Sequence, residues 1–151
     1  MSTATVTSAS DTSHGIPELK ARKRDPAIHE MVALADARGL IRDRALLAET
    51  LLRIERWSPS ALGKGVAVPH ARSVTVRSPR IVGARSPRGI EWGAPDAQPV
   101  QLVLLVLAPA EMGEDAFFQL VARAVGLTRL QRDRQRLIQG GLDDAQVGEL
   151  V

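Results

Sequence analysis

The stretch Gly63-Lys64-Gly65-Val66-Ala67-Val68-Pro69-His70-Ala71-Arg72 decides how the fold of this chain is interpreted. Its apolar residues 66–68 predict a short strand that ends at Pro69. Proline fixes its own φ and disfavours helical geometry in the residue before it, so the backbone leading to His70 is stiff and extended. The stretch therefore predicts a strand end that presents His70 in a defined direction.

A histidine held in this way suits phosphoryl transfer through an imidazole. One ring nitrogen must be unprotonated to act as the nucleophile, and the other should donate a hydrogen bond that fixes the tautomer. Donors already in place must stabilise the charge of the moving phosphoryl group. A guanidinium group matches phosphate oxygens, so Arg72 is a candidate for binding phosphate and Lys64 a weaker one. Gly63 and Gly65 tolerate positive φ, and their amide groups are candidates for an anion-binding concavity.

The same residues have less specific interpretations. A single histidine near a strand end is more often structural than catalytic, and a single arginine is more often a solvated surface charge. A P-loop is excluded, because Ser58 stands where its first glycine belongs and Gly65 where it requires Ser or Thr. We expect no metal site, because His14, His29 and His70 lie far apart in the sequence and the chain has no cysteine. We also expect no cofactor.

The composition limits the remaining classes of function. The chain has 151 residues, 44% of them hydrophobic, which predicts one domain with a real core. Its formal net charge is +3 and its aromatic residues are two Trp and two Phe, whereas a nucleic-acid binder shows a basic face with stacking aromatics. The longest apolar run, 100–109, is too short to span a bilayer. We therefore expect a cytoplasmic protein with no nucleic-acid partner and no direct membrane insertion.

The pattern along the chain divides it into a leader and a domain. Residues 1–24 are rich in Ser and Thr and then basic, and they lack a hydrophobic period, which predicts a disordered leader. The domain is expected to cover residues 25–151. It should begin at Asp25, a good N-cap, followed by a helix that ends at Gly39. A second helix is predicted over residues 43–56, with a turn-rich stretch after it.

The rest of the chain predicts strands and then helices. Strands are expected over residues 80–85 and 90–92, joined by a turn at 87–89, and the strand 100–107 is apolar on both faces, as a central strand would be. Helices are predicted from Glu114, over 132–139, and from Asp143 to the end. This order indicates an α/β fold, a three-layer sandwich in which a mixed β-sheet is flanked by α-helices in a single domain.

The central motif also resembles a known family signature. Gly63-x-Gly65-Val66-Ala67-Val68-Pro69-His70-Ala71 is similar to the phosphohistidine motif of the fructose/mannitol-type enzyme IIA domains of the bacterial sugar phosphotransferase system, a family that includes the nitrogen-regulatory enzyme IIA proteins. The similarity extends over residues 26–151. It includes the turn at Leu62-Gly63, the strand 99–105, Ala108-Pro109 and the helix that contains residues 119–123.

The resemblance implies an activity and its partners. His70 would accept phosphate from an HPr-type phosphocarrier protein and pass it to an enzyme IIB or to a regulatory target protein. Ser60 would take the place of the usual threonine and keep its hydroxyl near the phosphate. The chain departs from the family where an arginine usually precedes Glu55, since that place is Ile54. It departs again where a second histidine is usual, a place that we align with Phe117.

Three functions remain open from the sequence. The first is phosphoryl relay for sugar transport, and the second is a regulatory module whose phosphorylation state changes its binding to another protein. The third is a non-catalytic interaction domain that kept the fold but transfers phosphate poorly, which the apolar residues at 54 and 117 favour. In a working relay, Arg53 and Arg56 are further candidates for binding the phosphate. The sugar cannot be inferred, because such a domain contacts protein partners and phosphate.

Overall fold

The computed structural model describes residues 16–140. Its helices are α2 (Arg24–Ala37), α3 (Arg44–Trp57), α4 (Glu114–Gly126) and α5 (Gln131–Ile138). Its strands are β1 (Ala61–Gly63), β2 (Val66–Ala67), β3 (His70–Ser73), β4 (Arg80–Ile90) and β5 (Val100–Pro109). The helix expected from Asp143, like residues 1–15, lies outside the described residues.

Strand β5 is the centre of the sheet and pairs along both of its edges. On one edge β4 runs antiparallel to it over nearly its whole length. On the other edge β2 and β3 both run parallel to β5, with Val66 opposite Leu102 and His70 opposite Val106. Because both pairs keep the same register, β2 and β3 are two halves of one strand interrupted at residues 68–69. The predicted central strand is confirmed, since every residue of β5 except Gln101 is buried.

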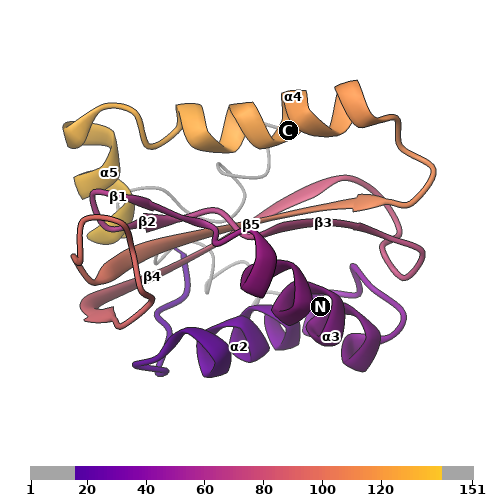
Figure 1. Ribbon diagram of the computed structural model, residues 1–151, viewed down its shortest axis with the longest axis horizontal. Helices are drawn as coiled ribbons and strands as arrows, with labels where there is room; N and C mark the ends of the chain where they lie inside the picture. The colour runs from indigo at the N-terminus through magenta and orange to yellow at the C-terminus, as the bar shows by residue number, and fades with distance from the viewer. Residues whose placement is uncertain (1–15, 141–151) are drawn as a thin grey trace, which may run out of the picture.

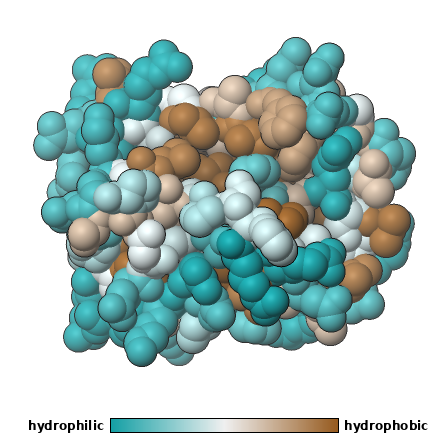
Figure 2. Space-filling model, in the orientation of Figure 1, coloured by the Kyte–Doolittle hydropathy of each residue, from teal (hydrophilic) through white to brown (hydrophobic). Residues whose placement is uncertain are grey.

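Helices cover both faces of this mixed sheet, as the sequence predicts (Figure 1). Helices α2 and α3 lie on one face, where Met31 and Leu47 join a first core with Leu105. Helices α4 and α5 lie on the other face, where Phe117 packs in a second core with Leu104. Figure 2 shows apolar surface gathered in the upper half of the viewed face, bordered by hydrophilic side chains. No helix within residues 16–140 is long and apolar enough to cross a membrane.

Two strands differ from the expectation. The predicted strands 80–85 and 90–92 form one strand, β4, with a register shift between Arg85 and Ile90. The Pro-Arg-Gly sequence at 87–89 is therefore an irregularity in a strand that β5 continues to pair, and not a reversing turn. The stretch expected to be rich in turns includes β1, which forms an antiparallel hairpin with β2.

The segment of residues 16–23 was expected to belong to a disordered leader, but it packs along the outer edge of β4. Arg85 N donates to Pro17 O at 2.9 Å, and Leu19 N donates to Arg85 O at 2.8 Å. Ile16 is 1% exposed and Leu19 is 6% exposed. The domain therefore begins before the expected boundary at residue 25. The order of this segment depends on a strand more than 60 residues away in the sequence, so its own periodicity does not indicate it.

Candidate functional site

His70 is the first residue of β3, directly after the interruption of the long strand. Pro69 has no N–H, so it cannot donate to β5 at this point. Its carbonyl nevertheless accepts a hydrogen bond of 2.9 Å from Val106 N, which holds the interruption against the central strand. The sequence predicted a strand end at this point, whereas His70 begins β3, and the bond to β5 holds the backbone before it.

The imidazole of His70 has one defined hydrogen bond. Its Nδ1 lies 2.8 Å from the carbonyl oxygen of Val68. A carbonyl oxygen only accepts, so Nδ1 must carry the proton, and in the neutral ring Nε2 keeps its lone pair. The side chain is half-buried, which leaves part of it accessible. This is the arrangement that a nucleophilic Nε2 requires.

Phe117 and Arg72 lie in front of the imidazole. The rings of His70 and Phe117 are 5.8 Å apart between centroids and tilted by 50°. The guanidinium carbon of Arg72 lies 5.5 Å from the centroid of the Phe117 ring, within the range of a cation–π contact. Arg72 Nη1 also donates to Met112 O at 3.0 Å. Since residues two apart in a strand point to the same face, Arg72 and His70 share the side on which Phe117 packs.

Ser60 is connected to the site through the backbone. Its carbonyl accepts a hydrogen bond of 2.9 Å from Val68 N. Its hydroxyl, however, donates to Glu55 Oε1 at 2.7 Å, and its amide donates to Glu55 Oε2 at 2.9 Å. Ser60 therefore lies next to the segment that carries His70, with its hydroxyl engaged by a buried carboxylate.

Gly63 and Gly65 were expected to bind phosphate, but they shape the hairpin between β1 and β2. Both have positive φ, +94° and +80°. Val66 and His70 are four residues apart along one parallel register, a separation of about 13 Å, so the glycines stand well away from the imidazole. The amide of Lys64 donates to Asp96 Oδ2 at 2.8 Å. The structure thus does not bring the predicted anion-binding loop to His70.

Asp96 fixes that hairpin to the loop before β5. Backbone N–H groups of Lys64, and then of Gln98, donate to its carboxylate and hold its pKa below the usual value. The Asp96 carboxylate thereby already accepts the hydrogen bond from the Lys64 amide that an anion bound at the hairpin would need.

Arg53 and Arg56 belong to the helical layer. Arg53 Nη1 lies 3.9 Å from Glu49 Oε1, one turn earlier in α3. Arg56 lines a groove of about 450 Å³ between α2 and α3, together with His29 and Leu52. Of the three arginines proposed from the sequence, Arg72 is the one whose contacts connect it with His70. Within residues 16–140 there is no group of three or more His, Cys, Asp or Glu side chains that could hold a metal ion.

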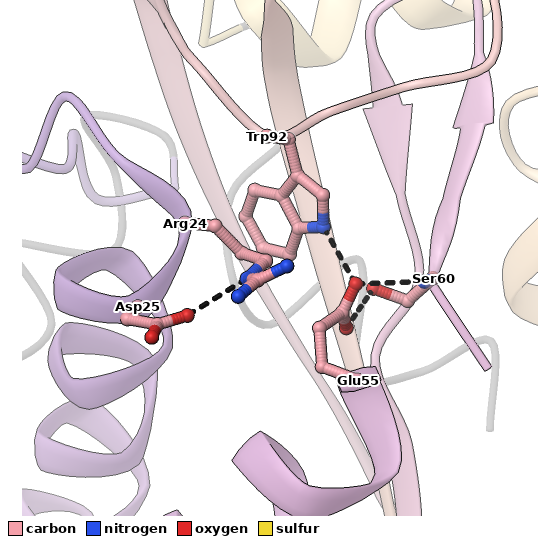
Figure 3. A network of polar contacts seen from close by, with 5 residues as sticks. All are labelled: Arg24, Asp25, Glu55, Ser60 and Trp92. Atoms are coloured by element: carbon pink, nitrogen blue, oxygen red, sulfur yellow. Dashed lines mark hydrogen bonds and ion pairs between the residues drawn. The ribbon is translucent and has the colours of Figure 1, made fainter. Parts of the chain in front are cut away.

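Sequence reasoning assigned no role to the network around Glu55. This side chain is 3% exposed, and its Oε2 accepts a hydrogen bond of 3.0 Å from Trp92 Nε1 besides the bond from Ser60 (Figure 3). A signal was present, because Leu47, Leu51 and Glu55 follow at intervals of four and share one face of α3. A glutamate on the buried face of a helix indicates a polar partner in the interior.

Comparisons with known proteins identify a family and a shared fold. A family model described as "Phosphoenolpyruvate-dependent sugar phosphotransferase system, EIIA 2" matches residues 13–140. The "PTS system fructose-specific EIIABC component" of Bacillus subtilis is 30% identical over 127 residues, 84% of this chain and 20% of that protein. The "Nitrogen regulatory protein" of Bradyrhizobium diazoefficiens is 35% identical over 119 residues, 79% of this chain and 74% of that protein. This chain thus spans about a fifth of the length of the first relative.

Solved structures share the fold. The nitrogen regulatory protein IIA-Ntr from Neisseria meningitidis has a TM-score of 0.77 at 22% identity, covering 92% of this chain and 93% of that chain. Enzyme IIA for mannitol from Escherichia coli, solved in a complex with phosphorylated enzyme IIB, has a TM-score of 0.67 at 20% identity, covering 82% of this chain and 83% of that chain. At these identities the likeness concerns the arrangement of helices and strands.

Proposed function

This chain belongs to the EIIA 2 family of the phosphoenolpyruvate-dependent sugar phosphotransferase system, and we propose that it is a phosphoryl carrier whose His70 accepts phosphate from an HPr-type protein. The observation that carries the proposal is the contact of 2.8 Å between His70 Nδ1 and Val68 O. It selects the tautomer in which Nε2 is the nucleophile, and it does so with backbone that is held against β5.

The proposed reaction is a direct transfer between two histidines. The lone pair on Nε2 of His70 attacks the phosphorus of a phosphohistidine on the donor. A new N–P bond forms while the N–P bond of the donor breaks, and the donor nitrogen keeps the electron pair. Because His70 retains the proton on Nδ1, its phosphorylated ring carries a positive charge. The carbonyl of Val68 stabilises that charge by accepting a charge-assisted hydrogen bond.

Arg72 is proposed to bind the phosphoryl oxygens. It is exposed, it lies on the same face of β3 as His70, and its current hydrogen bond goes to a backbone carbonyl, Met112 O. A guanidinium gains more from a dianion than from a neutral carbonyl, so a phosphate on His70 should draw it away from Met112. The apolar ring of Phe117 lies against both side chains, and an apolar neighbour lowers the local polarity in which the attraction would act.

The donor and the acceptor of the phosphate are proposed to be proteins. Phe118, whose ring centroid lies 5.8 Å from that of Phe117, is 53% exposed beside the site. An exposed aromatic ring beside Phe117, which itself packs on His70, suits contact with another chain. An enzyme IIB is a candidate acceptor, since the similar mannitol enzyme IIA was solved in a complex with one. We propose a cytoplasmic location for these encounters.

A regulatory role is the second candidate. It is favoured by the likeness to a nitrogen regulatory protein that is matched over 74% of its length. In that role phosphorylation of His70 would change the binding of a target protein. A non-catalytic interaction module is a third possibility, favoured by the apolar side chain of Phe117 against the imidazole.

The test is phosphorylation in a reconstituted relay. The protein is incubated with phosphoenolpyruvate, enzyme I and HPr, and acid-labile, alkali-stable phosphate should appear on it and disappear in His70→Ala. His29→Ala is the matched control and should be labelled like wild type, because His29 is on the surface of α2. Label that persists in His70→Ala would refute the assignment. Wild type that accepts no label would support the interaction module.

A further inference from the structure

We propose that Glu55 is a positioning residue for His70, acting through Ser60 and the peptide of Val68, with Trp92 holding its carboxylate in place (Figure 3). The inference rests on the proposed phosphoryl-carrier function, because it concerns the orientation of the histidine that would carry the phosphate. The hydroxyl of Ser60 donates to Glu55, and Glu55 in turn accepts from Trp92. Their role is to fix the carbonyl that selects the tautomer of His70.

The first part of the path connects α3 with the start of β1. The Glu55 carboxylate takes three hydrogen bonds: from Ser60 N at 2.9 Å, from Ser60 Oγ at 2.7 Å and from Trp92 Nε1 at 3.0 Å. An amide N–H and an indole N–H only donate, so both need an acceptor at this place. Because all three side chains are buried, water does not replace a lost acceptor without rearrangement.

The second part of the path connects Ser60 with the imidazole. Ser60 O accepts from Val68 N at 2.9 Å, and Val68 O accepts from His70 Nδ1 at 2.8 Å. On the far side, Pro69 O accepts from Val106 N at 2.9 Å. The backbone at Val68 is thereby held from β1 and from β5. The direction of the Val68 carbonyl follows from these two attachments, and the first of them depends on Ser60 staying in place.

Removing the carboxylate of Glu55 should free Ser60 and the Val68 peptide from their present positions. The N–H groups of Ser60 and Trp92 would be buried without partners, and the chain at Ser60 would have to move towards water to satisfy its amide. A displaced Ser60 lets the Val68 carbonyl turn, and Nδ1 then loses its fixed partner. A shift of about 1 Å in a reacting group can slow a reaction by roughly 100-fold.

A merely structural role of Glu55 predicts something different. In that case the loss of the carboxylate lowers stability but leaves the imidazole in its present tautomer. The test must therefore measure the tautomer itself, which ¹⁵N chemical shifts of the two ring nitrogens report. In wild type at a pH where the ring is neutral, we expect the large shift difference of one protonated nitrogen, Nδ1, and one unprotonated nitrogen, Nε2.

Two variants of similar size separate the possibilities. Glu55→Met cannot accept a hydrogen bond, and it should reduce the shift difference towards that of a mixture of tautomers. Glu55→Gln should keep the wild-type spectrum, because its amide oxygen can serve the two N–H donors while its NH₂ donates to the Ser60 hydroxyl. A wild-type tautomer in folded Glu55→Met would overturn the inference, as would an equal loss in both variants.

If Glu55→Met does not fold, variants of Ser60 are tested instead. Ser60→Ala removes the bond to Oε1 and keeps the bond from its amide, so the shift difference should decrease. Ser60→Thr keeps the hydroxyl and should retain the wild-type value. An unchanged tautomer in Ser60→Ala, together with an unfolded Glu55→Met, would show that Glu55 serves stability alone.

Phosphorylation by HPr then separates this inference from the function on which it rests. Glu55→Met should be phosphorylated up to about 100-fold more slowly than wild type, with Glu55→Gln close to wild type. Wild type that shows the Nδ1–H tautomer but accepts no phosphate would refute the carrier function and leave the positioning of His70 intact. Full-speed transfer in Glu55→Met would refute the positioning role.

Discussion

The two sides of His70 are built differently. At the back of the site, by which we mean Glu55, Ser60 and Trp92, buried polar groups meet one another in hydrogen bonds of 2.7–3.0 Å. At the front, by which we mean Arg72, Phe117 and Phe118, the contacts are aromatic rings 5.8 Å apart and one exposed guanidinium. The back fixes geometry, whereas the front supplies little charge.

The difference shows how the two demands of phosphoryl transfer are divided. The direction of the nucleophile is set by several hydrogen bonds that support one another, so it should resist small changes. In the proposed transfer, the charge of the phosphoryl group would be stabilised by Arg72, which is held by a cation–π contact and a backbone carbonyl. Changes at the back should therefore reduce stability, and should slow transfer only where Ser60 loses Glu55, whereas the loss of Arg72 at the front should slow transfer with little effect on stability.

The largest loss of stability is expected when the edge segment is removed, by which we mean residues 16–23 along the outer edge of β4. Glu91 N donates to Arg22 O at 2.8 Å, and Arg24 N donates to Glu91 O at 3.1 Å, so the edge segment holds the residue before Trp92. A chain that lacks residues 1–24 also loses the buried side chains of Ile16 and Leu19. At about 1.5–3 kcal/mol for each side chain, we expect a loss of about 3–6 kcal/mol in the free energy of unfolding.

The matched control for this truncation is a chain that lacks residues 1–15 alone and keeps Ile16 and Leu19. Urea unfolding of the two chains, followed by circular dichroism, gives the difference directly. Equal stabilities would show that the edge segment contributes nothing to the domain and that the back of the site ends at Trp92.

The second largest effect, a slower phosphorylation of His70, is expected for Arg72→Ala at the front of the site. Loss of a donor in comparable oxyanion sites costs about 3–4 kcal/mol of transition-state stabilisation, so the initial rate of His70 phosphorylation by HPr should fall by roughly 100- to 1000-fold. Because Arg72 is exposed, the free energy of unfolding should change by less than about 1 kcal/mol.

Arg53→Ala and Arg56→Ala are the controls for Arg72, since the contacts of both residues lie in the helical layer. They should transfer at the wild-type rate. If Arg72→Ala also does so while either control slows transfer, the phosphate lies on another side of His70 than the front defined here.

The sequence predicted the layers of the fold and the central strand, because those depend on local periodicity. Residues 100–107 are apolar on both faces, and only a buried strand of that length fits them. The motif around His70 likewise predicted a stiff presentation from the chemistry of proline alone. These features depend on residues that are close together in the sequence.

What the sequence could not predict depends on pairing between distant segments. Gly63 and Gly65 are typical of an anion-binding loop, but the register against β5 places Val66, the residue after this loop, about 13 Å along the strand from His70. Ile16 and Leu19 become ordered because β4 offers an unpaired edge. Glu55 finds a partner in Trp92, which lies 37 residues away. None of these contacts can be inferred from residues that are close together in the sequence.

A smaller effect on stability is expected in Trp92→Phe, which removes the indole N–H and leaves a smaller ring. The free energy of unfolding should fall by about 1–3 kcal/mol, from the lost hydrogen bond and the space left in the core. Transfer should stay within about threefold of wild type, because Ser60 keeps both bonds to Glu55. Phe118→Ala is the counterpart at the front, and its stability should change by less than about 0.5 kcal/mol. A reversed order of the two stabilities would contradict the division between back and front.

The last variant, Phe117→His, distinguishes a working relay from an interaction module. A second imidazole 5.8 Å from that of His70 offers a donor to the phosphoryl group, but it also puts a polar ring where Phe117 is 5% exposed. The burial should cost about 1–3 kcal/mol of stability. In a relay served by Arg72, the initial rate of phosphorylation should rise by less than the roughly 100- to 10,000-fold that a positioned acid–base group can contribute, because Arg72 already supplies a charged donor. In an interaction module, wild type barely accepts phosphate and the substitution should restore transfer from near zero.

Ile54→Arg is the less useful partner for this experiment, because Ile54 packs against the first core and a charge there would destabilise the helical layer. A Phe117→His protein that is folded and transfers more slowly than wild type would show that the apolar ring itself serves transfer, by keeping water away from the space between His70 and Arg72.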